Sequence, residues 1–251
     1  GASILNIVTG NQASQLAGGL SANGAVFLVN PQGINVAPTG RINAAGGFVA
    51  STLGLSEADF MAGRLAFSGA GGAVVNAGQI STGAGGLVAL IGSTVNNSGS
   101  IVAPLGKVGL GAAQAATLDW SGDGFLQVTL PSDATTVDGQ ALITHSGSIQ
   151  ADGGLVALKA ATVAQAVRNA VNMPGSISAR SVSGQNGAIV LDGGPGGVTQ
   201  VTGRLDVSAD AGSAGRIDVT GQSVQLQGAV LDARGAEQGG TVRIGGGYQG
   251  G

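Results

Sequence analysis

The residues nearest to a metal-binding pattern lie between positions 119 and 124. Asp119, Ser121 and Asp123 place side-chain oxygens at positions i, i+2 and i+4, as at the start of a calcium-binding EF-hand loop. Such a loop also needs a bidentate glutamate at its twelfth position, and Leu130 stands there instead. Asp119 and Asp123 are therefore a metal candidate without an essential ligand, and the segment is better interpreted as a hairpin turn.

The side chains used for acid–base and nucleophilic catalysis are few. His145 is the only histidine, which excludes sites built from several histidines and leaves little support for a Ser-His-Asp site. Thr144 and Ser146 flank it at a predicted corner, so we expect His145 to be exposed. The two glutamates, Glu57 and Glu237, lie in different regions, whereas a glycosidase needs paired carboxylates about one sugar.

The aspartates add no catalytic pattern. Asp206, Asp210 and Asp218 fall on separate predicted corners and strands, where we expect them to be solvated. No stack of aspartates with lysine or arginine neighbours is apparent on successive repeats. We therefore predict a protein that is not an enzyme and has no cofactor.

Two polar patterns indicate a structural role, one in a turn and the other in the stacking of repeats. Asn30-Pro31-Gln32-Gly33-Ile34 combines the turn formers Asn-Pro and Gln-Gly, in which proline fixes φ and Gly33 supplies φ > 0. Asn76 and Asn97 are one repeat apart, and each stands two positions before a glycine. We expect these two asparagines to stack at a corner and to hydrogen-bond along the stacking direction.

The composition indicates which elements position these residues. Glycine supplies 49 of 251 residues, charged residues only 9%, and hydrophobic residues 43%, so the chain has neither the high charge nor the low hydrophobicity of a disordered one. No apolar run is long enough for a transmembrane helix, and there is no cysteine. The formal charge of −3 disfavours a nucleic-acid surface and a polybasic membrane patch. Short strands joined by tight turns fit this composition.

A repeated phrase decides the expected fold. A Gly-x-apolar element begins at seven glycines and is followed in most repeats by a Gly-x-apolar-x-apolar element. The seven glycines are Gly40, Gly78, Gly99, Gly147, Gly175, Gly203 and Gly228. The interval from Ile80 to Ile101 is a normal length for one turn of a parallel β-helix. A β-sandwich is the alternative all-β fold, but it does not explain why the phrase recurs seven times.

Two segments depart from the repeat. Residues 117–128 contain the only tryptophan and predict a hairpin outside the helix that folds its aromatic residues back on a flank. At the start of the chain, residues 4–8 predict a strand and residues 12–16 one helical turn.

Four segments carry a family resemblance: SILNIVTG (residues 3–10), QLAGGL (15–20), NGAVFLVNPQGI (23–34) and GFVASTL (47–53). In this order they resemble the N-terminal secretion domain of filamentous-haemagglutinin-type exoproteins, which leave Gram-negative bacteria by two-partner secretion. The similarity is closest to the branch of high-molecular-weight adhesins and covers about residues 1–130. Residues 131–251 resemble the repeat shaft that follows such domains.

The resemblance implies a right-handed, single-stranded parallel β-helix that the periplasmic domains of an outer-membrane transporter recognise. An Asn-Pro-Asn-Gly-Ile phrase is characteristic of that family, and Gln32 replaces its second asparagine here, which puts in doubt any role that needs a short side chain at position 32. The family also has a capping region and a second Asn-Pro motif before the segment at residues 3–10. Neither is in this sequence, so we expect a truncated, processed or unusual member with an exposed strand edge.

These observations lead to three hypotheses. The first is a secreted segment at the cell surface that directs its own two-partner secretion and then forms an adhesin stalk, with Asn30 to Ile34 either a recognition motif or only a turn. The second is a matrix protein whose copies assemble head to tail into filaments. The third, a carbohydrate-binding adhesin, lacks the expected aromatic platforms, since the chain has one tryptophan and one tyrosine.

Overall fold

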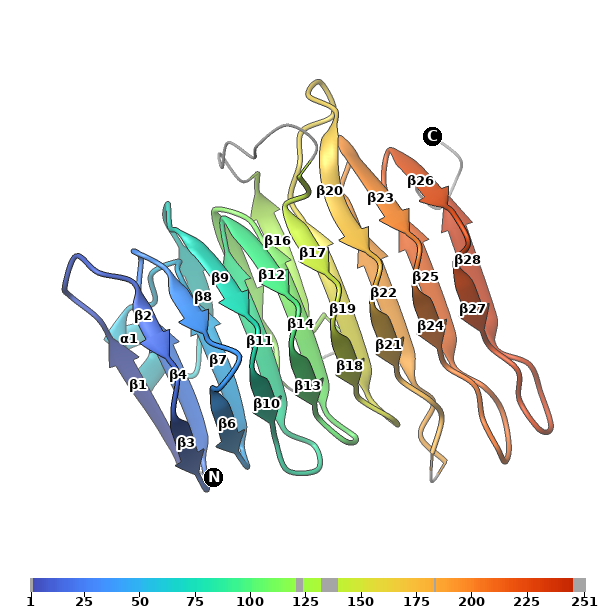
Figure 1. The fold of residues 1–251 in the computed structure, drawn as a ribbon, viewed down its shortest axis with the longest axis horizontal. Coiled ribbons are helices and arrows are strands. Elements are labelled where there is room, and N and C mark those ends of the chain that lie inside the picture. The colour runs from blue at the N-terminus through green and yellow to red at the C-terminus, as the bar shows by residue number, and fades with distance from the viewer. Residues whose placement is uncertain (1, 121–123, 132–139, 183, 246–251) are drawn as a thin grey trace.

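The chain winds into successive coils of β-strands, as shown by a computed structural model that describes residues 2–120, 124–131, 140–182 and 184–245. Equivalent strands of neighbouring coils lie side by side from the N-terminal to the C-terminal end (Figure 1). They form three parallel sheets of nine, eight and eight strands within the described residues. The protein is therefore a parallel β-helix, and the prediction from the glycine repeat is confirmed.

Each of the first eight coils contributes one strand to each sheet, and β28 (Thr241–Gly245) adds a ninth strand to the first sheet. The first sheet consists of β1 (Ser3–Ile7), β4 (Ala25–Val29), β7 (Gly47–Ser51), β11 (Leu87–Gly92), β14 (Lys107–Ala112), β19 (Leu155–Ala160), β22 (Ala188–Asp192), β25 (Arg216–Thr220) and β28 (Thr241–Gly245). The second consists of β2 (Ser14–Leu16), β5 (Ile34–Val36), β9 (Ala73–Asn76), β12 (Thr94–Asn97), β17 (Ile143–His145), β20 (Arg168–Met173), β23 (Gly197–Val201) and β26 (Ser223–Leu226). The third consists of β3 (Gly19–Ala22), β6 (Arg41–Ala44), β10 (Gln79–Ser81), β13 (Ser100–Val102), β18 (Ser148–Gln150), β21 (Ser176–Ser178), β24 (Arg204–Asp206) and β27 (Val230–Asp232). Since β2 is a strand, the helical turn expected at residues 12–16 was wrong.

The Gly-x-apolar phrase builds the third sheet. After six of the seven glycines its apolar residues stack in register and are buried, among them Ile80, Ile101 and Ile149. The prediction for the seventh, Val230 after Gly228, was wrong: Val230 is exposed, and Leu231 pairs with Leu205 instead. Burial of one such side chain contributes about 1.5–3 kcal/mol. The glycine before it recurs because the coils approach closely there: a Cβ atom on Gly147 would overlap the carbonyl oxygen of Gly99.

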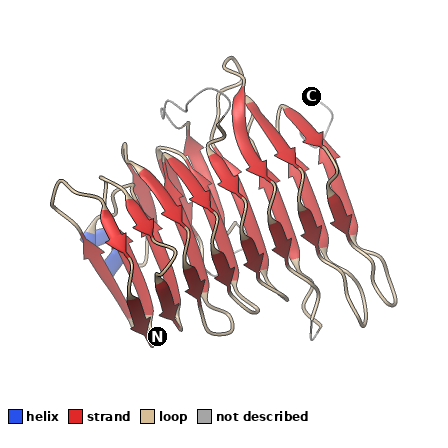
Figure 2. Ribbon diagram, in the orientation of Figure 1, coloured by secondary structure: helices blue, strands red, loops and turns tan. Residues whose placement is uncertain are grey.

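A second layer covers part of the outer face of the first sheet. It contains β8 (Leu65–Ser68), β15 (Ala115–Leu118) and β16 (Leu126–Leu130) in the antiparallel order β16-β15-β8. The helix α1 (Glu57–Met61), blue in Figure 2, precedes β8. Its Ser56 cap accepts a hydrogen bond from the amide of Asp59. Beneath this layer both faces of the first sheet are covered, and β11 is buried at every residue.

The hairpin predicted at residues 117–128 is confirmed by the pairing of β15 with β16. Phe125 packs back on the flank as expected and is 1% exposed. Trp120 does not, because 39% of it is exposed. The sequence did not predict β8, which comes from an earlier coil and pairs with β15.

Candidate functional site

The Asn-Pro segment forms a tight turn between β4 and β5. The amide of Gly33 donates a hydrogen bond to the carbonyl oxygen of Asn30 at 3.1 Å, which closes the turn. The Asn30 side chain also accepts a hydrogen bond from the amide of Gln32 at 3.0 Å. Gly33 has a φ of 129°, in the region that favours glycine. Pro31 and Gln32 are exposed at the tip, and Ile34 is buried.

The buried Asn30 side chain joins this turn to the coil before it. Its Nδ2 atom donates to the carbonyl oxygen of Gln12 at 3.0 Å and to Oγ of Ser14 at 2.9 Å. On the other side, the carbonyl oxygen of Pro31 accepts a hydrogen bond from the amide of Gly72 at 2.8 Å. The turn is thus tied to coils on both sides. It presents two exposed side chains on a backbone whose position is fixed.

Asn76 and Asn97 lie at the ends of β9 and β12, in register, and both are buried. Nδ2 of Asn76 lies 2.7 Å from Oδ1 of Asn97, so the two amides are hydrogen-bonded from coil to coil. Oδ1 of Asn76 also accepts a hydrogen bond from the amide of Gly78 at 3.1 Å. The residues that we selected from their spacing therefore lie together inside the helix.

His145 extends this row by one coil, and the expectation that it is exposed was wrong. It is fully buried, with Nδ1 3.0 Å from Nδ2 of Asn97 and Nε2 3.1 Å from the carbonyl oxygen of Ser176. Burial lowers the pKa of His145, against the opposing effect of its two backbone carbonyl contacts. A neutral imidazole fits this position, because Nδ1 then accepts from Asn97 and Nε2 donates to Ser176. We call Asn76, Asn97 and His145 the Asn–His row.

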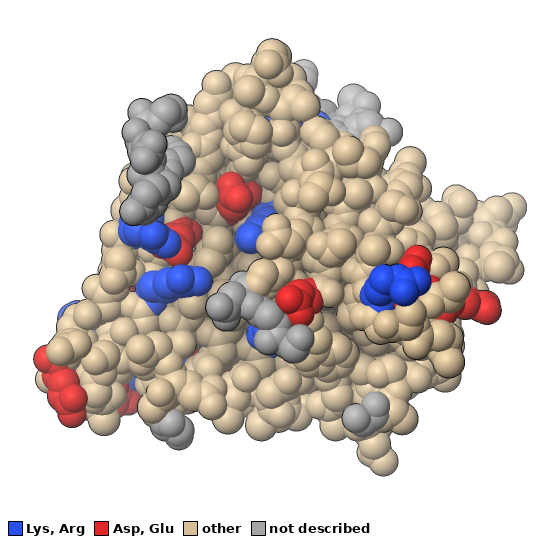
Figure 3. All heavy atoms as spheres, turned by 180° about the vertical axis from the view of Figure 1, so that it is seen from behind, with Lys and Arg blue, Asp and Glu red and all other residues tan. Residues whose placement is uncertain are grey.

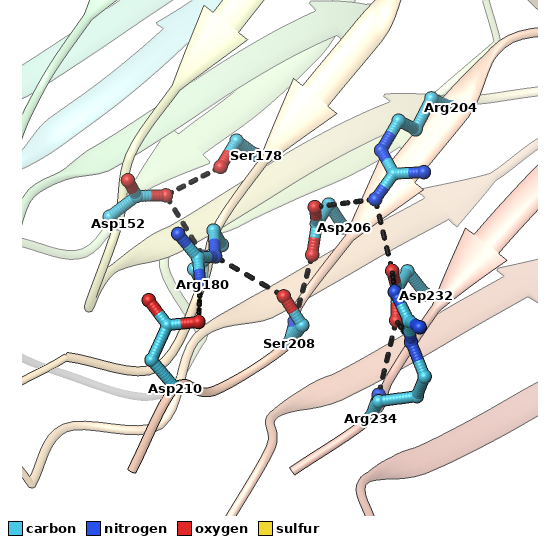
Figure 4. A network of polar contacts seen from close by, with 9 residues as sticks. All are labelled: Asp152, Ser178, Arg180, Arg204, Asp206, Ser208, Asp210, Asp232 and Arg234. Carbon is cyan, nitrogen blue, oxygen red and sulfur yellow. Dashed lines mark hydrogen bonds and ion pairs between the residues drawn. The ribbon is translucent and has the colours of Figure 1, made fainter. Parts of the chain in front are cut away.

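A second polar row runs along a corner after the third sheet, where we expected no stacked aspartates (Figure 4). Asp206 and Asp232 are in register, and one Nη atom of Arg204 contacts them at 2.8 Å and 3.0 Å. Arg234 reaches Asp232 at 2.7 Å, and Arg180 pairs with Asp210. The network continues to Asp152 and to the hydroxyl groups of Ser178 and Ser208. We call these nine residues the Arg–Asp row.

The expectation that Asp206 and Asp218 are solvated was therefore wrong. Their side chains are only 15% and 10% exposed, and Asp218 pairs with Arg216 and Arg243. Asp210 is 89% exposed, as expected. Hydrogen bonds from Arg234 hold the pKa of Asp232 far below its usual range, and the contact with Arg204 acts in the same direction. A carboxyl group in this state does not supply the raised pKa that a glycosidase acid requires.

The sequence does contain a signal for the Arg–Asp row. Ile-Ser-Ala-Arg (177–180), Leu-Asp-Val-Ser (205–208) and Leu-Asp-Ala-Arg (231–234) each begin at an apolar residue of the third sheet, and the three apolar residues are in register. Aligned on that residue, they place polar side chains at the same two positions of three successive coils.

The metal candidate is not assembled in the described residues. Asp119 lies beside the hairpin, where its amide donates to the carbonyl oxygen of Phe125 at 2.9 Å, and Asp123 lies outside the described residues. Within the described part of the chain, no three or more His, Cys, Asp or Glu side chains are grouped to hold a metal ion. No helix described in the structure is long and apolar enough to cross a membrane.

The stacked coils and the antiparallel layer on one flank define an elongated β-helical domain held together by polar rows at its corners. A family model, the TPS secretion domain, matches residues 1–207. The chain therefore belongs to the TPS, or two-partner secretion, secretion domain family. The resemblance to filamentous-haemagglutinin and high-molecular-weight-adhesin exoproteins is confirmed.

A solved structure agrees with this assignment. The crystal structure of the HMW1 secretion domain from Haemophilus influenzae is similar to this chain with a TM-score of 0.82 and 34% sequence identity. The match covers 99% of this chain and 64% of the length of that one. None of the curated proteins matches the sequence.

Proposed function

We propose that this chain directs the two-partner secretion of a larger, non-enzymatic exoprotein through an outer-membrane transporter. Membership of the TPS secretion domain family and the similarity to the HMW1 secretion domain support this function. In this proposal residues 1–130 carry the secretion signal. Residues 131–251 continue as a shaft that serves as a surface stalk outside the cell.

The Asn30 turn is the proposed contact for the periplasmic domains of the transporter. The observation that carries this assignment is that different residues of the turn hold its backbone and face the solvent. Asn30 is buried and holds the backbone, whereas Pro31 and Gln32 are exposed and are not needed for the turn's own hydrogen bonds through their side chains. A rigid exposed dipeptide loses little conformational entropy when a partner binds.

Folding outside the cell would favour outward movement of the chain. Each coil adds a stacked apolar residue, such as Ile149 on Ile101, and a further set of hydrogen bonds to the coil before it. Because every coil buries the face of its neighbour, a coil that has formed stabilises the next one. Return of the chain to the periplasm would then require these contacts to be broken.

The test uses the exoprotein that contains this chain, expressed together with its transporter. Gln32→Lys changes the exposed tip and leaves the Asn30 side chain in place. The matched control is Ala84→Lys, which adds the same charge to an exposed turn closed by a hydrogen bond from Gly86 to Gly83 at 3.0 Å. We expect Gln32→Lys to lower the secreted fraction while the melting temperature stays unchanged, and Ala84→Lys to alter neither.

Secretion of Gln32→Lys at the wild-type level would refute the role of the turn in recognition. Asn30→Ala provides a second comparison, because it should lower both the melting temperature and secretion. If only the melting temperature fell in Asn30→Ala, the segment would be a structural turn.

A further inference from the structure

The outer face of the first sheet forms an open trough in the C-terminal half of the molecule, where the antiparallel layer ends. A cavity of about 770 Å³ is lined by the first residues of β14, β19, β22, β25 and β28 and by the corners that precede them. A smaller cavity of about 200 Å³ shares Leu155 and Arg216 with it and reaches Phe125 and Leu126 of the flank. We call these two cavities together the trough.

One wall of the trough consists of long corners stacked on one another. The corner between β6 and β7 contains only residues 45–46, whereas the later corners span residues 179–187, 207–215 and 233–240. The amide of Ala214 donates to the carbonyl oxygen of Gln238 at 3.0 Å, and the amide of Glu237 donates to the carbonyl oxygen of Gly212 at 2.9 Å. The wall is thus held in place by hydrogen bonds between coils.

The charge of the trough is opposite to that of the whole chain. Among its described lining residues, Lys107, Lys159 and Arg216 are cationic and Asp218 is the only carboxylate, in a protein of formal charge −3. Asp218 is shared, because it lies 3.6 Å from Arg216 and also pairs with Arg243. Figure 3 shows the molecule from behind, with lysine and arginine side chains on this side and aspartate or glutamate side chains among them; Asp192, which is not a lining residue, is in register with Lys159. The trough therefore favours an anionic occupant.

The remaining lining groups distinguish between anionic occupants. Gln185, Asn186, Ser213, Gln238 and Thr241 supply amides and hydroxyls that both donate and accept hydrogen bonds. The floor of the trough is the face of a sheet in which β14, β19, β22 and β25 each pair with a strand on both sides, so an acidic peptide lying on these four strands finds no free edge with which to pair. A polysaccharide that carries many hydroxyl groups and also carboxylates or sulfates can hydrogen-bond to the amides and hydroxyls of the lining and pair with its guanidinium group.

We propose that the trough binds an anionic glycan, with Arg216 and Lys159 contacting its acidic groups and the stacked corners contacting its hydroxyls. This binding differs from the glycan recognition that needs aromatic platforms, and it goes beyond the secretion role. The larger cavity of the trough, at about 770 Å³, lies within the range of about 300–1,000 Å³ that is usual for small-ligand sites, which fits a few sugar units.

The test is isothermal titration calorimetry of the purified full chain with three probes: heparin oligosaccharides, oligogalacturonate and neutral dextran. We expect binding of heparin, oligogalacturonate or both, weakened by added salt, and none of dextran. A response to heparin alone identifies sulfates as the recognised groups, and a response to oligogalacturonate alone identifies carboxylates. Equal binding of dextran, or no binding of either anionic probe, would overturn the proposal.

Variants locate the site. Arg216→Gln should weaken binding by at least about tenfold, because it removes a hydrogen bond between two charged groups. Ala188→Glu places a carboxylate beside Arg216 on the floor and should abolish binding. The matched control is Arg41→Gln, which removes an exposed cation from the third sheet. Melting temperatures verify that each variant is folded; if Arg41→Gln weakened binding as much as Arg216→Gln, the trough would not be the site.

Discussion

Nδ2 of Asn97 lies 3.0 Å from Nδ1 of His145, although the two residues are 48 positions apart in the sequence. Asn76 fixes the orientation of this contact, because its Nδ2 atom donates to Oδ1 of Asn97 and turns the amide nitrogen of Asn97 toward the histidine. With its proton at Nε2, His145 accepts from the Asn97 side chain at Nδ1, which also lies 3.2 Å from the carbonyl oxygen of Asn97, and donates to the carbonyl oxygen of Ser176. The Asn–His row thus forms one directed series of hydrogen bonds across four coils.

The first prediction concerns pH. The pKa of His145 is lower in the folded protein than its ordinary value near 6.5, so the unfolded chain binds more protons as the pH falls below that value. Stability should therefore decrease as the pH falls through about 6.5, until the lower folded-state pKa is reached. His145 is the only histidine, so His145→Gln should flatten this part of the melting-temperature profile. An equally steep profile in the variant would contradict the prediction.

The second prediction concerns the two asparagines of the same row. Replacement of both Asn76 and Asn97 by alanine removes their mutual hydrogen bond and leaves Nδ1 of His145 without the Asn97 amide. Each lost buried partner costs about 1–3 kcal/mol, and each kcal/mol lowers the melting temperature by about 2–4 °C in a protein of this size. Asn96→Ala is the matched control, since Asn96 lies on the same strand and is exposed. An unchanged melting temperature in the double variant would show that the Asn–His row does not stabilise the fold.

The repetitive part of the fold was predictable from the sequence, because each coil repeats the same local requirements. Gly99 and Gly147 are glycines for the same steric reason, and Ile101 and Ile149 face the same interior. The third sheet and most of the first follow from these positions alone.

Insertions between coils explain why the position of His145 and the pairing of β8 with β15 could not be predicted. Asn76 and Asn97 are separated by a single coil without an insertion, so their stacking is visible in the sequence. The hairpin between β14 and β17 lengthens the interval between Asn97 and His145 well beyond one ordinary coil and hides that they also stack. The pairing of β8 with β15 has a similar cause, because both strands are insertions and neither belongs to the repeat.

The third prediction tests the close approach of the coils. Gly147→Ala places a Cβ atom against the carbonyl oxygen of Gly99, and the parallel strands on either side prevent the backbone from moving away. Overpacking of this kind costs about 1–3 kcal/mol or more. Gly18→Ala is the control, since a Cβ atom there meets nothing within 4 Å. Urea denaturation should show a lower midpoint for Gly147→Ala and little change for Gly18→Ala; equal midpoints for the two variants would refute the steric explanation.

The fourth prediction separates buried from exposed ion pairs in the Arg–Asp row. Asp232 is only 7% exposed and its pKa is lowered by Arg234 and Arg204, so its ionised form stabilises the fold at neutral pH. This contribution is present above the unfolded-state pKa near 3.8 and is lost as the pH falls through the lower folded-state value. Asp232→Asn should therefore lower the free energy of unfolding by about 1.5–3 kcal/mol at pH 7 and reduce the acid dependence below pH 3.8. Asp210→Asn removes a carboxylate that is 89% exposed, for which a loss of only about 0–1 kcal/mol is expected. If the two variants were equally stable at pH 7, the Arg–Asp row would contribute no more to the fold than ordinary surface ion pairs.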